Sequence, residues 1–175
     1  MNAYRSPGRR PGTTPLGRAA RTTSVVTLIG IGVLHAAWGA GASWPMADRA
    51  ELADAVLGAP GSEFGGASAS YAVAGALGTA AALVAGWPGT LEQPRRVAVA
   101  GIAAILGGRG ALGLAGRTNW VSPVSTGSRF RRLDRRVYAP LCLTLAALTA
   151  LSLTGERGPA QEDDLLPLEL GPGNH

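Results

Sequence analysis

Two ionisable side chains stand inside stretches that are otherwise apolar, and both could do chemistry. The first is His35 in "LIGIGVLHAAWGAGASWP", where Trp38, three residues further on, would share its face of a helix. An imidazole can exchange a proton near neutral pH or hold a ligand through a ring nitrogen. The alternative is a neutral histidine that hydrogen-bonds to a neighbouring helix. We therefore take His35 and Trp38 as candidate binding residues.

Arg109 in "LGGRGALG" is the second ionisable side chain within an apolar run. Its guanidinium offers a planar fork of donors that suits a carboxylate or a phosphate. It could bind an anionic group, pair with Asp134 to fix the fold, or extend its side chain toward a membrane surface. Because ionisable groups inside membrane spans are costly and often functional, we predict that Arg109 faces the protein interior, near His35 or Asp134.

A basic segment, "FRRLDRRVY", surrounds Asp134 with arginines. Arg132, Asp134 and Arg135 are candidate binding residues, because such a cluster could cradle a lipid headgroup or another anion. The alternative is a solvated basic segment where a helix begins.

Metal and cofactor chemistry lack the residues that they need. The only other histidine is His175, and Cys142 is the single cysteine, so we expect no metal site, no cofactor and no disulfide. The stretch "GRGALG" matches a dinucleotide-binding motif, but that motif requires a strand before it and a helix after it. Glycine-rich packing inside one helix is the better interpretation.

The elements that must position these residues are apolar helices. The chain has 175 residues, of which 26 are glycine, and such small residues suit close helix packing in a bilayer. A bilayer core needs about 20 apolar residues per helix, and four runs meet this length. We predict an all-α, four-helix transmembrane bundle in residues 22–155, with disordered tails at 1–21 and 156–175. The predicted helices lie near 24–43, 67–86, 97–115 and 138–154.

Several further expectations concern these spans. The first run could instead be a signal peptide, but three later spans favour a retained helix. A short amphipathic helix is expected soon after Asp48, and residues 117–136 are expected to form a polar loop. Every fourth residue from Ser70 to Gly86 is small, which predicts a ridge that packs against another helix. Exposed aromatic side chains at membrane surfaces would be Trp44, Trp87, Trp120 and Tyr138.

The arginines indicate orientation as well as partners. Five of them precede the first span, which favours a cytoplasmic N-terminus in the plasma membrane. The arginine clusters flank apolar runs, so anionic lipids are expected partners, and nucleic acid is not. With four spans, His35, Trp38, Arg109 and the segment around Asp134 gather on one side of the membrane.

These same residues carry a family resemblance. The pairing of "LHAAWGAGASWP", the Arg-Gly late in the third run and "FRRLDRRVYAPLCLTLA" resembles domain-of-unknown-function family 3995, a bacterial family of small membrane proteins. The resemblance covers roughly Thr22 to Leu153 and implies four membrane helices. It implies no chemistry, because the family's role is not established.

The sequence thus predicts an integral membrane protein with a polar pocket on one membrane face. The pocket would bind an anionic lipid, a small amphiphile or a partner protein, and homo-oligomers remain open. The alternative is a membrane-embedded enzyme that uses His35 as acid and base and Arg109 as an anion clamp. No second catalytic carboxylate or nucleophile was identified in the spans, so we assign no catalytic residue.

Overall fold

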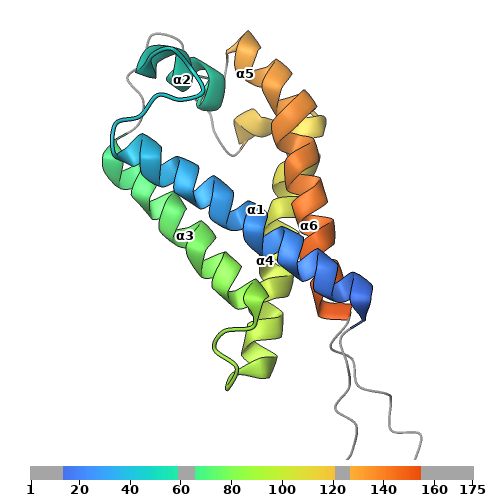
Figure 1. The fold of residues 1–175 in the computed structure, drawn as a ribbon. Helices are drawn as coiled ribbons and strands as arrows, with labels where there is room; N and C mark the ends of the chain where they lie inside the picture. Colours follow the sequence, from blue (N-terminus) through green and yellow to red (C-terminus); the bar gives the residue numbers. More distant parts are fainter. Residues whose placement is uncertain (1–13, 59–65, 121–126, 155–175) are drawn as a thin grey trace, which may run out of the picture.

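The protein is all-helical in the part of the chain that its computed structural model describes, residues 14–58, 66–120 and 127–154 (Figure 1). Four helical segments there are long and apolar enough to cross a membrane, as the sequence predicts. In chain order the elements are α1 (Pro15–Gly39), α2 (Arg49–Val56), α3 (Ala67–Ala85), α4 (Glu92–Leu114), the 3₁₀ turn η1 (Thr118–Trp120), α5 (Ser128–Leu133), the π-helical turn η2 (Asp134–Tyr138) and α6 (Ala139–Thr154).

Helix α1 begins earlier than the apolar run does. The Thr14 side chain caps it by accepting a hydrogen bond from the Gly17 amide at 3.1 Å, and Pro15 occupies the first turn, where its missing N–H costs nothing. Residues 15–21 are therefore helical, which corrects the expected disordered tail at 1–21 in that part. The helix also ends at Gly39 rather than at 43, just before Gly41 adopts a φ of 104°.

The four long helices pack as two pairs that meet at one end. Figure 1 shows α1 lying along α3 and crossing α6, and α4 packs along α6. The buried core at the crossing draws on all four helices and consists of Leu28, Ala81, Val84, Val99 and Leu145. Helices α3 and α4 make few contacts with each other. The core thus closes one end of the four-helix arrangement. At the other end, space remains between the α1–α3 pair and the α4–α6 pair.

Two arginines at the start of α4 stabilise this closed end by hydrogen bonds to the ends of α3 and α6. The Arg95 side chain is 3 % exposed, pairs with Glu92 at 3.0 Å, and donates to the carbonyl oxygen of Leu83 near the end of α3 at 3.1 Å. Arg96 donates to the carbonyl oxygen of Leu153 near the end of α6 at 3.4 Å. Cations at helix C-termini satisfy carbonyls that lack a partner within the helix. The ends of α3 and α6 are therefore joined to the start of α4.

The ridge of small residues on α3 packs against α1 only in part. Ser70 is buried and the Ala74 carbonyl lies 3.5 Å from a Cβ built on Gly32 of α1, but Gly78 is exposed and a Cβ there meets nothing within 4 Å. A spacing of four advances about 40° around a helix at each step, so the ridge turns away from α1. The prediction that the ridge packs along its whole length was wrong at Gly78.

The expected polar loop at 117–136 is helical in its second half. Helix α5 begins at Ser128 and continues through η2 into α6, and Phe130 and Asp134, four residues apart, are both buried. Such spacing marks one face of a helix, which the surrounding arginines concealed in the sequence. The short helix expected after Asp48 is α2, and the Asp48 carboxylate caps it by accepting from the Glu51 amide at 2.8 Å.

Candidate functional site

A cavity of about 420 Å³ lies between the two helix pairs, above the core. Its walls come from all four long helical segments and from Val56 of α2, and most of the side chains that line it are apolar. The polar groups on its wall are His35, Trp38, Arg109 and Tyr138. The volume falls in the range of about 300–1,000 Å³ that is typical of small-molecule sites. The structure thus brings three of the predicted site residues, from two distant parts of the chain, to one cavity.

His35 lies one turn before the end of α1, and its side chain lines the cavity. Its Nδ1 donates a hydrogen bond to the Ile31 carbonyl oxygen at 2.9 Å; since a carbonyl only accepts, this contact assigns the hydrogen to Nδ1. The sequence left open a hydrogen bond from His35 to a neighbouring helix, but the bond that holds the ring lies within α1 itself. Within the described residues Nε2 has no hydrogen bond, so a neutral His35 offers it as an acceptor.

Trp38, the second candidate binding residue on α1, is buried against His35 and bonds to the chain that follows the helix. Its ring centroid lies 4.8 Å from that of His35, and only 5 % of the residue is exposed. The indole Nε1 donates to the Trp44 carbonyl oxygen at 2.7 Å, and Arg49 donates to the Trp38 carbonyl oxygen at 3.1 Å. These bonds fix the connection from α1 to α2, and so they place α2 over the outer end of the cavity.

Arg109 faces the protein interior and pairs with Asp134, as predicted. Its Nη2 lies 2.6 Å from Asp134 Oδ1, and the Asp134 side chain is only 3 % exposed. The Thr118 hydroxyl donates to the other carboxylate oxygen of Asp134. Because a buried charge needs a partner, this pair neutralises Arg109 where it meets the cavity. Arg109 Nη1 is buried and has no acceptor among the described residues.

Glycines let α4 approach α6 closely enough to form this pair. A Cβ on Gly113 would lie 2.7 Å from the Ala139 Cβ and 2.9 Å from Arg109 Nη1, and one on Gly110 would lie 2.9 Å from the Ala139 carbonyl oxygen. These distances are too short for a side chain. The glycine-rich stretch around Arg109 is therefore a helix-packing surface, in agreement with the sequence interpretation.

The six predicted site residues do not form a single pocket. His35, Trp38 and Arg109 line the cavity, and Asp134 lies behind Arg109. Arg132 and Arg135 are exposed. They lie two residues before and one residue after the buried Asp134, so their side chains point to other sides of the helix. Neither arginine lines this cavity, so their part in binding stays a prediction. Within 14–58, 66–120 and 127–154, no group of three or more potential ligand side chains could hold a metal ion.

Sequence reasoning placed Tyr138 at a membrane surface, but it belongs to the cavity wall. Its hydroxyl donates to the Ala55 carbonyl oxygen of α2 at 3.2 Å, and its ring centroid lies 6.2 Å from that of Phe130. The spacing of four from Asp134 to Tyr138 was the available signal. By contrast, Trp44 and Trp87 are 71 % exposed and Trp120 is 68 % exposed, so their location at the membrane surface stays a prediction.

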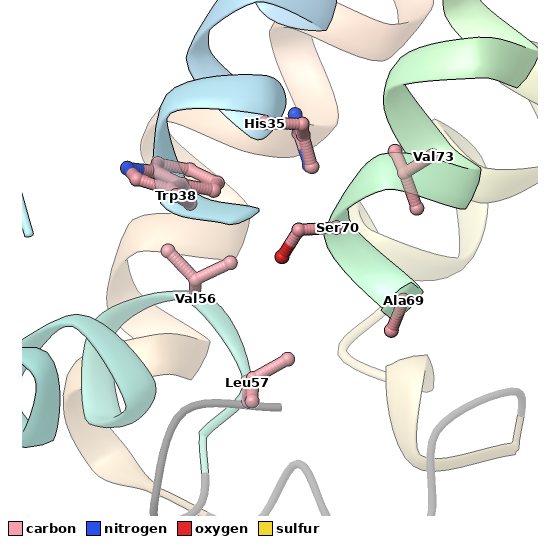
Figure 2. A pocket seen from close by; sticks show the side chains of 7 residues that line it. All are labelled: His35, Trp38, Val56, Leu57, Ala69, Ser70 and Val73. Carbon is pink, nitrogen blue, oxygen red and sulfur yellow. The ribbon is translucent and has the colours of Figure 1, made fainter. Parts of the chain in front are cut away.

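A smaller hollow of about 120 Å³ adjoins the cavity (Figure 2). It shares His35, Trp38, Val56 and Val73 with the cavity wall, so the two spaces meet around His35. Figure 2 shows the His35 ring and the Ser70 side chain pointing into the gap between α1 and α3, above α2. The sequence identified Ser70 only as a small packing residue, because nothing in its spacing revealed what it would face.

Comparison with known proteins identifies a family. Residues 28–149 match the model of a family described as "Protein of unknown function (DUF3995)", as the resemblance implied. No curated protein and no solved structure shows significant similarity to the chain.

Proposed function

The chain belongs to the DUF3995 family, whose function is unknown, and we propose that it is an integral membrane protein that binds a small amphiphile in the cavity between its four long helices. One observation carries the proposal. An apolar cavity of suitable volume has the polar groups of His35, Arg109 and Tyr138 on its wall. An amphiphile satisfies both parts of such a wall, with its chain against the apolar side chains and its head at the polar groups.

Selectivity over bulk lipid must come from those polar groups and from the shape of the cavity. Lipid tails are as apolar as leucine, so moving a chain from the bilayer into the cavity gains little from the hydrophobic effect. A hydrogen bond inside an apolar site is worth more than one at a wet surface, because the groups there have no water to compete for them. The head of the ligand therefore decides what binds.

Helix α2 covers the outer end of the cavity. Leu52, Ala53 and Ala55 are completely buried. The Tyr138 hydroxyl donates to the Ala55 carbonyl oxygen of α2 at 3.2 Å, and the Gly127 amide donates to the carbonyl oxygen of Gly58, two residues beyond the end of α2, at 2.9 Å. Val56 of α2 lines the cavity itself. A ligand held under this cover would be separated from water at its head.

The polar part of the cavity would lie toward the outer face of the plasma membrane. His35 is four residues before the end of α1, which corresponds to about 6 Å along the helix. A cytoplasmic N-terminus, favoured by the five arginines before the first span, puts this end of α1 on the opposite side of the membrane.

The proposal is tested by purifying the protein in mild detergent and identifying what remains bound by native mass spectrometry. Leu106→Trp should fill the cavity and exclude the amphiphile. Ile105→Trp is the matched control, because Ile105 is the adjacent residue and is 74 % exposed. We expect a defined amphiphile on the wild-type protein and on Ile105→Trp but not on Leu106→Trp. Equal retention by all three would contradict the proposal, and a chemically modified lipid would favour the enzyme alternative instead.

A further inference from the structure

Building on the amphiphile-binding function, we propose that the polar end of the ligand is an uncharged hydroxyl group, held between the Ser70 hydroxyl and Nε2 of His35. The site is the small hollow that adjoins the cavity, and the chain of the ligand passes His35 into the cavity itself (Figure 2).

The Ser70 side chain is a buried polar group whose own helix does not satisfy it. The residue is 6 % exposed and lines the hollow, and its hydroxyl has no hydrogen bond within the described part of the chain. A serine or threonine within a helix can donate back to the carbonyl four residues earlier, as Thr79 does to Gly75 at 2.9 Å in this same helix. Ser70 makes no such bond, so its hydroxyl is directed to the hollow. The hydroxyl is therefore available for a hydrogen bond to a group in the hollow.

His35 supplies the complementary group from the other side of the hollow. Its Nδ1 is occupied by the bond to Ile31, so Nε2 of the neutral ring is an acceptor. A hydroxyl group is the smallest group that both donates and accepts. It can donate to Nε2 of His35 and accept from the Ser70 hydroxyl, and it fits a hollow of about 120 Å³.

Charge decides against an ionised head. None of the described residues that line the hollow carries a formal charge. In the adjoining cavity, the only charged side chain on the described wall is Arg109, and Asp134 already neutralises it at 2.6 Å. Arg132 and Arg135, which could offset a phosphate or a carboxylate, are exposed and line neither space. Among the described residues, a charged head in the hollow would therefore find no charged partner, and burying an unpaired charge is costly.

The test compares three probes of equal chain length on the full-length protein: tetradecan-1-ol, its methyl ether and tetradecanoate. Binding is measured by native mass spectrometry at a pH of about 8. An exposed carboxyl group has a pKa of roughly 4, so the carboxylate probe is offered in its ionised form. We expect the alcohol to bind about tenfold more tightly than the ether, which cannot donate, and than the carboxylate. This comparison needs no variant, so it does not depend on whether a mutant folds.

A variant then locates the head. Ser70→Ala should lower the affinity for the alcohol and leave that for the ether nearly unchanged, and Ser68→Ala on the exposed side of α3 is the matched control. Tighter binding of tetradecanoate, or an unchanged preference for the alcohol in Ser70→Ala, would overturn the hydroxyl site. If all three probes bind equally and Leu106→Trp loses them all, amphiphile binding stands and only the hydroxyl site fails. If no probe binds to the wild-type protein, amphiphile binding itself fails.

Discussion

Arg109 on α4 and Asp134 on the π-helical turn before α6 are joined by an ion pair of 2.6 Å, and they come from parts of the chain 25 residues apart. The Thr118 hydroxyl occupies the second oxygen of Asp134, so the carboxylate connects α4, η1 and η2. Removing one member of a buried pair leaves the other charge without compensation, whereas replacing both can restore stability.

We therefore expect Asp134→Asn to lower the free energy of unfolding by about 3 kcal/mol, at the low end for buried pairs because 28 % of the Arg109 side chain is exposed. The double substitution Arg109→Met with Asp134→Leu should recover most of this loss. Thermal unfolding in detergent measures both. Unfolding of Asp134→Asn at the wild-type temperature would show that the pair contributes nothing to the fold.

The contact between α4 and α6 gives a second prediction. Gly113→Ala introduces a Cβ that would lie 2.7 Å from the Ala139 Cβ, so we expect a cost of about 1–3 kcal/mol from overpacking. Gly78→Ala is the matched control, since a Cβ there meets nothing within 4 Å and alanine is the better helix former. Gly113→Ala should therefore unfold at a lower temperature than Gly78→Ala. The reverse order would mean that these helices pack differently.

The cover over the cavity depends on Tyr138. Tyr138→Phe removes the hydrogen bond to the Ala55 carbonyl oxygen, which is worth about 0.5–1.5 kcal/mol, and should speed amide hydrogen exchange in α2. Tyr71→Phe is the control, because Tyr71 is 50 % exposed and its hydroxyl makes no hydrogen bond within the described residues. If exchange in α2 is the same in both variants, Tyr138 does not hold the cover.

Orientation is tested by cysteine labelling in intact cells, with Cys142 replaced by alanine. A reagent that cannot cross the membrane should label Asn119→Cys, in η1 on the His35 side, and should leave Ser6→Cys unlabelled. The opposite pattern would place the N-terminus outside the cell and the polar part of the cavity toward the cytoplasm.

Much of the fold could be predicted because apolar length is a strong signal. The expected span at 67–86 coincides with α3 almost residue for residue, since charged and turn residues bound that run on both sides. The start of α1 was missed because capping by Thr14 extends the helix into a polar segment that has no apolar period. The helix from Ser128 was missed because its buried face is narrow and arginines surround it.

The candidate site could be predicted only in part. The inward position of Arg109 followed from the cost of burying a charge, whereas Asp134 was one of two neighbours that the sequence left open. The rotation of each helix did not follow, because small residues on several faces of α3 look alike in sequence. Ser70 and Gly78 therefore received the same role, although one faces the hollow and the other is exposed.

Photoaffinity labelling tests most directly whether an amphiphile occupies the cavity. A fourteen-carbon alcohol with a diazirine near the middle of its chain is irradiated with the purified protein, with and without excess tetradecan-1-ol, and the labelled residues are mapped by mass spectrometry. We predict labels on the cavity wall, at Leu34, Leu77 and Leu106, that the competitor removes. Labels confined to the exposed residues Ile29, Val33 and Ile105, and unaffected by the competitor, would contradict the account.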